Sequence, residues 1–338
     1  MTKGNINTEN KIIAMPFLLK PAVKDYLWGG HRLKDDFSKD TDLFPLAETW
    51  ECSTHPDGLS VAISGEFCGK TLKEILKLHP EFLGRNLKAQ GELPILIKFI
   101  DADKNLSVQV HPDDEYASKY ENGQCGKTEM WYVLDASEDA KLVYGFYHKM
   151  KKEAVRQSVA EGTFEKYLQK IPVKKDDVFF IRAGTVHAIG AGALIAEIQE
   201  NSNLTYRLYD YNRIDKNGQK RELHIEKALD VADLNASEKP RQPMRVLKYH
   251  RGCASELLCQ CKYFRVERIL VNTERIREMA DFKINEDSFQ VLLCIEGCGI
   301  LSWEKGGLNF FKGDCVFVPA AFMSLKLHGK AQLLKVNC

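Results

Sequence analysis

Two distant stretches of the chain repeat one pattern of turn and strand. Residues 176–187 read DDVFFIRAGTVH, and residues 313–324 read GDCVFVPAAFMS. Asp177 aligns with Asp314, and each aspartate precedes a run of four apolar residues that ends at a second turn. Such runs between turn signals are typical of short buried strands. The repeat predicts two related β units in one chain, with a chance likeness between two strands as the alternative.

The two copies differ where the second turn ends. His187 stands at this point in the first copy, and Ser324 stands there in the second. We therefore expect one unit with a polar site and one without. Further short apolar runs between turn residues, such as residues 290–295, favour an all-β barrel or sandwich. Apolar residues at helical spacing predict a short helix over residues 72–78 and a helical interruption over residues 151–170.

The near-neutral net charge limits the classes of molecule that the chain can bind. The 338 residues include 48 lysines and arginines against 47 acidic residues, a formal net charge of +1. This excludes a broad basic surface for nucleic acid or an anionic membrane, so an anionic substrate must be bound by a local group of cations. No apolar run approaches the roughly 20 residues of a membrane helix, and no secretory signal is recognisable. The ten scattered cysteines fit reduced thiols, so we expect a cytoplasmic protein.

The strongest local signal is the segment LSVQVHPDD at residues 106–114. Ser107, Gln109 and His111 alternate with apolar residues, so on a strand they share one face. Three polar side chains on the inner face of a barrel are costly unless they bind something. A solvated face is the alternative interpretation of this stretch alone.

Two further segments supply groups that can bind a metal. Lys127 and Glu129 stand at the mouth of an apolar strand in KTEMWYVL, and a buried carboxylate needs a cation. Taken alone, Glu129 could be an edge residue and His187 a structural histidine. Together with the preceding segment they offer two imidazoles, one carboxylate and one amide oxygen: Gln109, His111, Glu129 and His187. This set suits a catalytic zinc, or another borderline divalent ion, with room for a substrate oxygen.

The segment EIQENSNLTYRLYDYNR, residues 197–213, is dense in polar and aromatic residues. Arg207 and Arg213 lie six residues apart, on the same face if the segment is extended. A pair of guanidinium groups suits a phosphate or an enediolate oxygen. An ordinary solvated loop is the alternative.

These segments, in this order, resemble the type I phosphomannose isomerases. The motifs that carry the resemblance are DYLWGG (25–30), WECSTHPDG (50–58), QVHPDD (109–114), KTEMWYVL (127–134), AGTVHAIGAG (183–192) and TYRLYDYNR (205–213). The resemblance runs from about residue 16 to the C-terminus and implies a mainly β, double-cupin fold, with two barrel or jelly-roll units and a small helical insertion. Residues 1–240 would form the catalytic cupin, with the insertion near 151–170, and residues 241–338 a degenerate one.

The resemblance also implies an activity. The chain would interconvert mannose 6-phosphate and fructose 6-phosphate through an enediol, using one zinc ion, or another divalent ion, held by the four residues Gln109, His111, Glu129 and His187. We expect Arg207 and Lys127 to act in catalysis, with Glu197 and His55 as further candidates for the general base. The expected substrate-binding residues are Ser107, Glu197, Arg213 and Lys98. Which cations hold the phosphate stays open among Lys98, Lys127, Arg207 and Arg213.

The chain departs from the family in two places. It is too short for the large helical insertion of the longer members, and Gly126 stands where some relatives have a histidine before the lysine. Two other functions compete with the isomerase. One is a cupin dioxygenase with iron on two histidines and a carboxylate, which needs no paired arginines. The other is a non-catalytic sugar-binding or storage cupin, which would not need the full ligand set.

Overall fold

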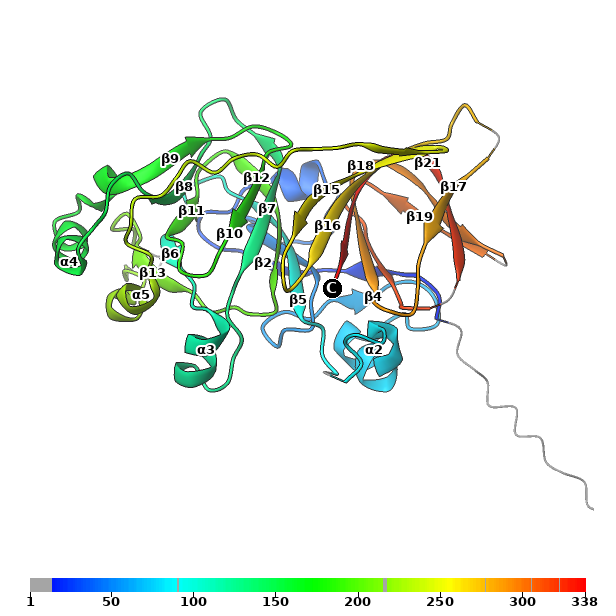
Figure 1. The fold of residues 1–338 in the computed structure, drawn as a ribbon, viewed down its shortest axis with the longest axis horizontal. Helices are drawn as coiled ribbons and strands as arrows, with labels where there is room; N and C mark the ends of the chain where they lie inside the picture. Colours follow the sequence, from blue (N-terminus) through cyan, green and yellow to red (C-terminus); the bar gives the residue numbers. More distant parts are fainter. Residues whose placement is uncertain (1–13, 90, 215–217, 277, 305, 322) are drawn as a thin grey trace, which may run out of the picture.

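The computed structural model describes residues 14–89, 91–214, 218–276, 278–304, 306–321 and 323–338. Its strands form three antiparallel sheets, which lie side by side along the long axis of the molecule (Figure 1). Short helices cover one end of this row and flank the sheets. The predicted mainly β fold of two barrel units with a small helical insertion is confirmed.

Two sheets face each other in the first unit. The six-stranded sheet has the order β10 (Val178–Ile181), β7 (Glu129–Ala136), β12 (Ala193–Glu200), β5 (Ile95–Asp101), β3 (Glu48–Cys52) and β2 (Ala22–Lys24). The five-stranded sheet has the order β13 (Tyr206–Tyr209), β6 (Val108–Val110), β11 (His187–Ile189), β8 (Lys141–Phe146) and β9 (Leu168–Pro172).

The third sheet forms the second unit. Its order is β14 (Lys248–His250), β15 (Cys253–Gln260), β16 (Arg265–Asn272), β21 (Ser324–Asn337), β18 (Gln290–Trp303), β20 (Cys315–Val318), β1 (Phe17–Lys20) and β4 (Val61–Ala62). Strands β17 (Ala280–Lys283) and β19 (Gly306–Phe311) pair with β21 and β18. Because β1 and β4 come from the N-terminal part of the chain, this sheet joins both ends of the sequence. The domain division at residue 240 stays a prediction.

The helices are short. They are α1 (Arg32–Asp35), α2 (Leu72–Leu78), α3 (Asp114–Tyr120), α4 (Lys152–Ala160) and α5 (Ile225–Val231), with single 3-10 turns at Pro80–Leu83 and Phe164–Tyr167. Within the described residues, no helix has the length and apolar character needed to cross a membrane.

The two predicted helical segments have different outcomes. Helix α2 occupies the predicted residues, and the Thr71 side chain caps it by accepting a hydrogen bond from the backbone at the third helical position. The helical insertion is shorter than predicted. Helix α4 ends at Ala160, Gly162 adopts a φ of +70°, and Leu168 begins strand β9 instead of extending a helix. Pairing of β9 with β8, which local spacing does not reveal, explains the difference.

The six-stranded sheet is buried on both faces. All seven residues of β5 are buried, and its apolar side chains enter two different clusters on the two faces. Ile97 and Phe99 pack against residues of the second unit such as Val291 and Phe317. Ile100 packs in the cluster between the two sheets of the first unit. This sheet is therefore a shared wall, with the second unit behind it and the interior of the first unit in front.

The predicted repeat has the same hydrogen bonds in both copies. The side chains of Asp177 and Asp314 each accept a bond from the backbone N–H three residues earlier, at 3.0 and 2.8 Å. Their backbone carbonyls each accept a bond from the neighbouring strand, at 2.9 Å in both copies. The preceding residue has a positive φ in each, +73° at Asp176 and +99° at Gly313. The likeness is therefore structural and not accidental.

A buried ion pair links the N-terminal segment to the second unit. The Lys39 amine donates to the Glu51 carboxylate, at 2.7 Å, and to the backbone carbonyl of Gly313. Lys39 is 8% exposed and Glu51 is not exposed at all. Burial raises the pKa of the Glu51 carboxyl, and Lys39 opposes that shift. Removing one partner of such a pair leaves the other without compensation.

We predict that Lys39→Met lowers the free energy of unfolding by about 3–5 kcal/mol, because it leaves the Glu51 carboxylate buried without a cation. Urea unfolding measures the change. Arg85→Met is the matched control, since the Arg85–Asp287 pair also joins the two units but lies at the surface, with the arginine side chain 68% exposed. Its loss should cost about 0–1 kcal/mol. Equal effects of the two substitutions would contradict the prediction.

Candidate metal centre

Each sheet of the first unit contributes a row of directly opposed residues. On the five-stranded sheet the row crosses β13, β6 and β11 and consists of Arg207, Gln109 and His187. On the six-stranded sheet it crosses β7, β12 and β5 and consists of Trp131, Glu197 and Lys98. The rings of Trp131 and His187 have centroids 5.3 Å apart, so the two rows face each other across the interior.

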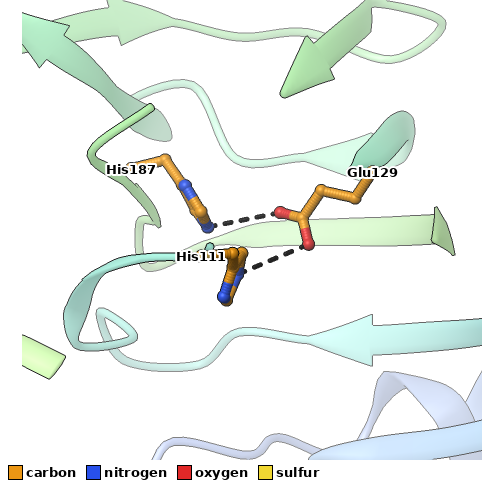
Figure 2. A group of neighbouring side chains, drawn as sticks. All are labelled: His111, Glu129 and His187. Carbon is orange, nitrogen blue, oxygen red and sulfur yellow. Dashed lines mark ion pairs between the residues drawn. The ribbon is translucent and has the colours of Figure 1, made fainter. Parts of the chain in front are cut away.

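His111, Glu129 and His187 converge on one point between the sheets (Figure 2). The Nε2 atom of His187 lies 3.2 Å from Oε1 of Glu129, and Nε2 of His111 lies 3.6 Å from Oε2. One ligand atom from each residue lies within 4.8 Å of the others. All three side chains have at most 1% of their surface exposed. A single ion between them would touch all three.

Local backbone structure aims the histidines. The His187 ring donates from Nδ1 to the Thr185 carbonyl, at 2.8 Å, which leaves the Nε2 lone pair directed at Glu129. Gly184, with a φ of +85°, forms the turn before β11. Its N–H donates to the His111 carbonyl at 2.9 Å, so the two segments that carry the histidines are tied together.

The electrostatics of the three residues fit a cation. Burial lowers the pKa of His187 to about 4. Burial also lowers the pKa of His111 well below its ordinary value, and Lys127 and His187 lower it further. Both imidazoles are therefore neutral near pH 7 and able to act as ligands. Burial raises the pKa of Glu129, although Lys127 opposes this, and both carboxylate oxygens are buried without a hydrogen-bond partner. A divalent ion would compensate this carboxylate.

Gln109 and Lys127 adjoin the three residues. The amide nitrogen of Gln109 lies 3.4 Å from Nε2 of His187, and half a turn of the amide would bring its oxygen to the same place. The Lys127 amine lies 3.2 Å from Glu129 and 3.3 Å from Nε2 of His111. The structure thus brings together all four predicted ligands and one predicted catalytic residue.

A cavity of about 290 Å³ opens next to this group. The predicted residues among those lining it are Ser107, Gln109, Lys127, Glu197, Lys98 and Arg207. Polar residues that the sequence analysis did not single out also line it: Tyr26, Glu48, Asn203, Thr205 and Arg221. Glu48 stands on β3 and the other four lie in loops, which local sequence patterns do not place at the cavity.

Lys98 is surrounded by acceptors. Its amine lies 3.5 Å from Glu48 and 3.4 Å from Glu197, and 4.9 Å from the centre of the Trp50 ring. Burial would lower the pKa of Lys98, but the two carboxylates outweigh burial and raise it. Trp131 donates its indole N–H to Glu197 at 2.9 Å, which fixes that carboxylate. Lys98 is therefore a charged and already paired cation.

Two predicted residues lie elsewhere. Strand β13 ends at Tyr209, and Tyr211 and Asn212 have φ values of +55° and +52°. The condition for a shared face, that residues 207–213 are extended, is therefore not met, because the chain turns before Arg213. The Arg213 guanidinium binds Asp210 and the Asn105 carbonyl and is not among the residues that line the cavity.

The second displaced residue is His55. It lines a separate, larger cavity of about 860 Å³, together with Thr54 and Asp57. Asn203 lines both cavities, so the two are neighbours. The roles predicted for His55 and Arg213 stay predictions.

The backbone around Gly126 leaves no room for a side chain at this position. A Cβ atom at this position would lie 2.5 Å from the backbone carbon of Asp113 and 2.6 Å from the nitrogen of Asp114. Backbone atoms cannot move aside as a flexible side chain can. A histidine at this position, as expected from the family resemblance, therefore does not fit this chain, and Lys127 follows directly in the tight segment.

We predict that Gly126→Ala lowers the free energy of unfolding by about 1–3 kcal/mol, because the added methyl group forces the two backbone segments apart. The shift should also displace Lys127 and reduce turnover of the folded variant. Chemical denaturation and steady-state kinetics measure the two effects. Wild-type stability would show that the segments separate freely, against this interpretation.

The chain is similar to known proteins along almost its whole length. Residues 17–168 match the family model described as phosphomannose isomerase type I, catalytic domain, and residues 255–338 match mannose-6-phosphate isomerase, cupin domain. The mannose-6-phosphate isomerase ManA of Bacillus subtilis is 36% identical over 323 residues, which cover 94% of this chain and 98% of that protein.

Two further comparisons agree. The mannose-6-phosphate isomerase of Streptococcus mutans is 35% identical over 95% of this chain and 98% of its own length. A crystal structure of mannose 6-phosphate isomerase from Bacillus subtilis superposes with a TM-score of 0.86 at 33% identity, covering 95% of this chain and 99% of that chain.

Proposed function

The chain belongs to the type I phosphomannose isomerases, and we propose that it interconverts mannose 6-phosphate and fructose 6-phosphate through an enediol. One observation carries the proposal. A buried group of two imidazoles and a carboxylate lies beside a cavity that is also lined by two arginines and two lysines. The reaction needs a cation where negative charge develops and a cationic partner for the phosphate. The cavity offers both.

We propose one zinc ion per chain as the cofactor, held by His111, Glu129 and His187, with Gln109 as a weaker fourth ligand. Nitrogen and carboxylate donors suit zinc. The orphaned oxygens of Glu129 and the two neutral imidazoles support this ligand set. When bound, the ion would polarise the carbonyl and hydroxyl oxygens of the open-chain sugar.

Arg207 is proposed to stabilise the charge that grows on the enediolate. It stands opposite Gln109 in the row on the five-stranded sheet. Its hydrogen bonds go to the Ser107 hydroxyl at 3.3 Å and the Glu222 carbonyl at 2.8 Å, both of them neutral groups. The guanidinium is therefore held in place without being neutralised by those partners, and it can act on a developing negative charge.

The proton that moves between the two carbons needs a base. Lys127, as its neutral amine, is the proposed base for this step, because it lines the cavity next to the His–Glu–His group. Glu197 is the alternative. Burial raises its pKa, but Lys127 and Lys98 outweigh burial and the net shift is downward, so Glu197 is ionised and able to accept a proton.

Ser107, Glu197 and Lys98 are proposed to bind the sugar, since all three line the cavity. Lys98 and Glu197 hold each other in place, which fixes a donor and an acceptor for hydroxyl groups. The contact of Arg213 with the substrate remains the prediction of the sequence. A cytoplasmic location is proposed as well, in line with ten cysteines that are all unpaired.

We predict that His111→Ala loses most of its metal and at least about 100-fold of its isomerase activity, because one ligand of a buried site is removed. Metal analysis and a coupled assay with mannose 6-phosphate give the two readouts. Chelation of the wild-type enzyme should have the same effect, and zinc should reverse it. His31→Ala, which removes an exposed histidine, is the control and should change neither. Unchanged zinc content and activity of His111→Ala would refute the ligand assignment.

We predict that Arg207→Ala lowers kcat by about 100- to 1,000-fold and leaves KM nearly unchanged, because the guanidinium acts mainly on the transition state. The kcat of Arg207→Lys should lie between those of the wild type and Arg207→Ala, since lysine keeps the charge and loses the planar arrangement of N–H donors. Steady-state kinetics with a check of metal content measure this. A large rise in KM at near-normal kcat would make Arg207 a binding residue.

A further inference from the structure

The four cations of the cavity differ in the partners they already have. Lys127 lies against Glu129, and Lys98 lies between Glu48 and Glu197. Both lysines are at most 4% exposed and are compensated by carboxylates. Neither lysine therefore offers unpaired positive charge to a phosphate. A phosphate needs positive charge that is not already balanced.

The arginine end of the cavity has an excess of positive charge. Arg213 and Arg221 both bind the carboxylate of Asp210, with the Nε atom of Arg221 at 2.8 Å from it. Arg207 lies close to them. Burial lowers the pKa of Arg207, and the charge of Arg221 lowers it further. Two guanidinium groups thus share one buried carboxylate and a third lies nearby, an arrangement that an added anion would stabilise.

The cavity has a direction. Its inner end is the His–Glu–His group, next to Gln109, and Arg207 stands one strand further along the same row. Arg221 lines the same cavity, with 29% of its side chain exposed, so it lies towards the opening. A sugar phosphate has its reacting carbons at one end and its phosphate at the other. With the carbons at the buried end, the phosphate would reach the exposed arginine.

We propose that Arg221 binds the phosphate group of the substrate and that Asp210 holds its guanidinium in position. Asp210 accepts bonds from Nε and Nη2 of Arg221, which leaves the other N–H donors of the guanidinium for phosphate oxygens. This inference rests on the proposed function and names a residue that the sequence analysis did not single out. Arg213 would support it indirectly, through the shared carboxylate.

The test is Arg221→Gln in the metal-loaded enzyme. KM for mannose 6-phosphate should rise about 10- to 100-fold, the effect of losing hydrogen bonds to a charged group. Inhibition by inorganic phosphate should weaken by a similar factor. Turnover at saturation, metal content and any conversion of unphosphorylated mannose should stay within about threefold of wild type. A merely structural role would alter the two sugars alike.

Arg156→Gln is the matched control. Arg156 also binds a carboxylate through Nε and Nη2, here Glu226 at 2.9 and 2.7 Å, but on the exposed surface of α4. Its loss should leave both KM and phosphate inhibition unchanged. Arg221→Lys is a second variant for the case that the glutamine variant does not fold, and it should give a smaller rise in KM.

Arg213→Gln tests the rival residue. The proposal is overturned if Arg213→Gln raises KM as much as Arg221→Gln does, or if Arg221→Gln changes neither KM nor phosphate inhibition. Calorimetry with inorganic phosphate separates this proposal from the proposed function. Phosphate binding that depends on Arg221, in an enzyme that does not isomerise mannose 6-phosphate, would support the site and refute the activity. Isomerase activity together with phosphate binding that does not depend on Arg221 would support the proposed function and refute the phosphate site.

Discussion

Glu129 carries a carboxylate into a region with no exposed surface, and such a group costs several kcal/mol unless cations surround it. Lys127 lies beside its Oε2 atom, and its Oε1 atom faces the neutral ring of His187. The surrounding structure holds these neighbours of the Glu129 carboxylate in place. The Thr185 carbonyl turns the lone pair of His187 towards the carboxylate, and the close approach of Gly126 to Asp113 fixes the segment that leads into Lys127. A divalent ion at this point would satisfy the carboxylate and both rings together.

The six-stranded sheet, which carries Glu129, is supported by packing against the second unit. Strand β5 points Lys98 into the site and Phe99 into the core shared with the C-terminal strands. Neighbouring β12 divides its residues in the same way, with Glu197 towards the site and Ile198 in the shared core. Charged groups on one face are therefore held by apolar packing on the other. The second unit acts as the support of this wall, and its own core is filled by apolar side chains.

Patterns among neighbouring residues predicted the structural features that depend on neighbouring residues alone. The alternation of Ser107, Gln109 and His111 predicted a shared face, because a strand places every second residue on the same side. Helix α2 was equally predictable from its spacing and its cap. The register between strands and the turns of the loops were not predictable from such patterns. Lys98 meets Glu197 through the pairing of β5 with β12, and Arg221 lies in a loop and binds Asp210, eleven residues earlier. The left-handed residues at Tyr211 and Asn212, which turn Arg213 away, carry no glycine to signal them.

The duplicated turn shows how one backbone unit serves two purposes. Asp177 and Asp314 close the same turn with the same hydrogen bonds, so the strands that follow enter their sheets alike. The difference arises after the second turn. His187 begins a strand that lies beside β6, whose Gln109 faces it directly. Ser324 begins a strand whose partner, β17, contributes Lys283 at the opposed position and apolar residues such as Phe282 to the core. A histidine that ligates a metal needs other ligand side chains beside it, and at that position the second unit has an exposed lysine instead. Divergence at the last residue of the repeat and at the residue opposed to it therefore separates the candidate catalytic barrel from the supporting one.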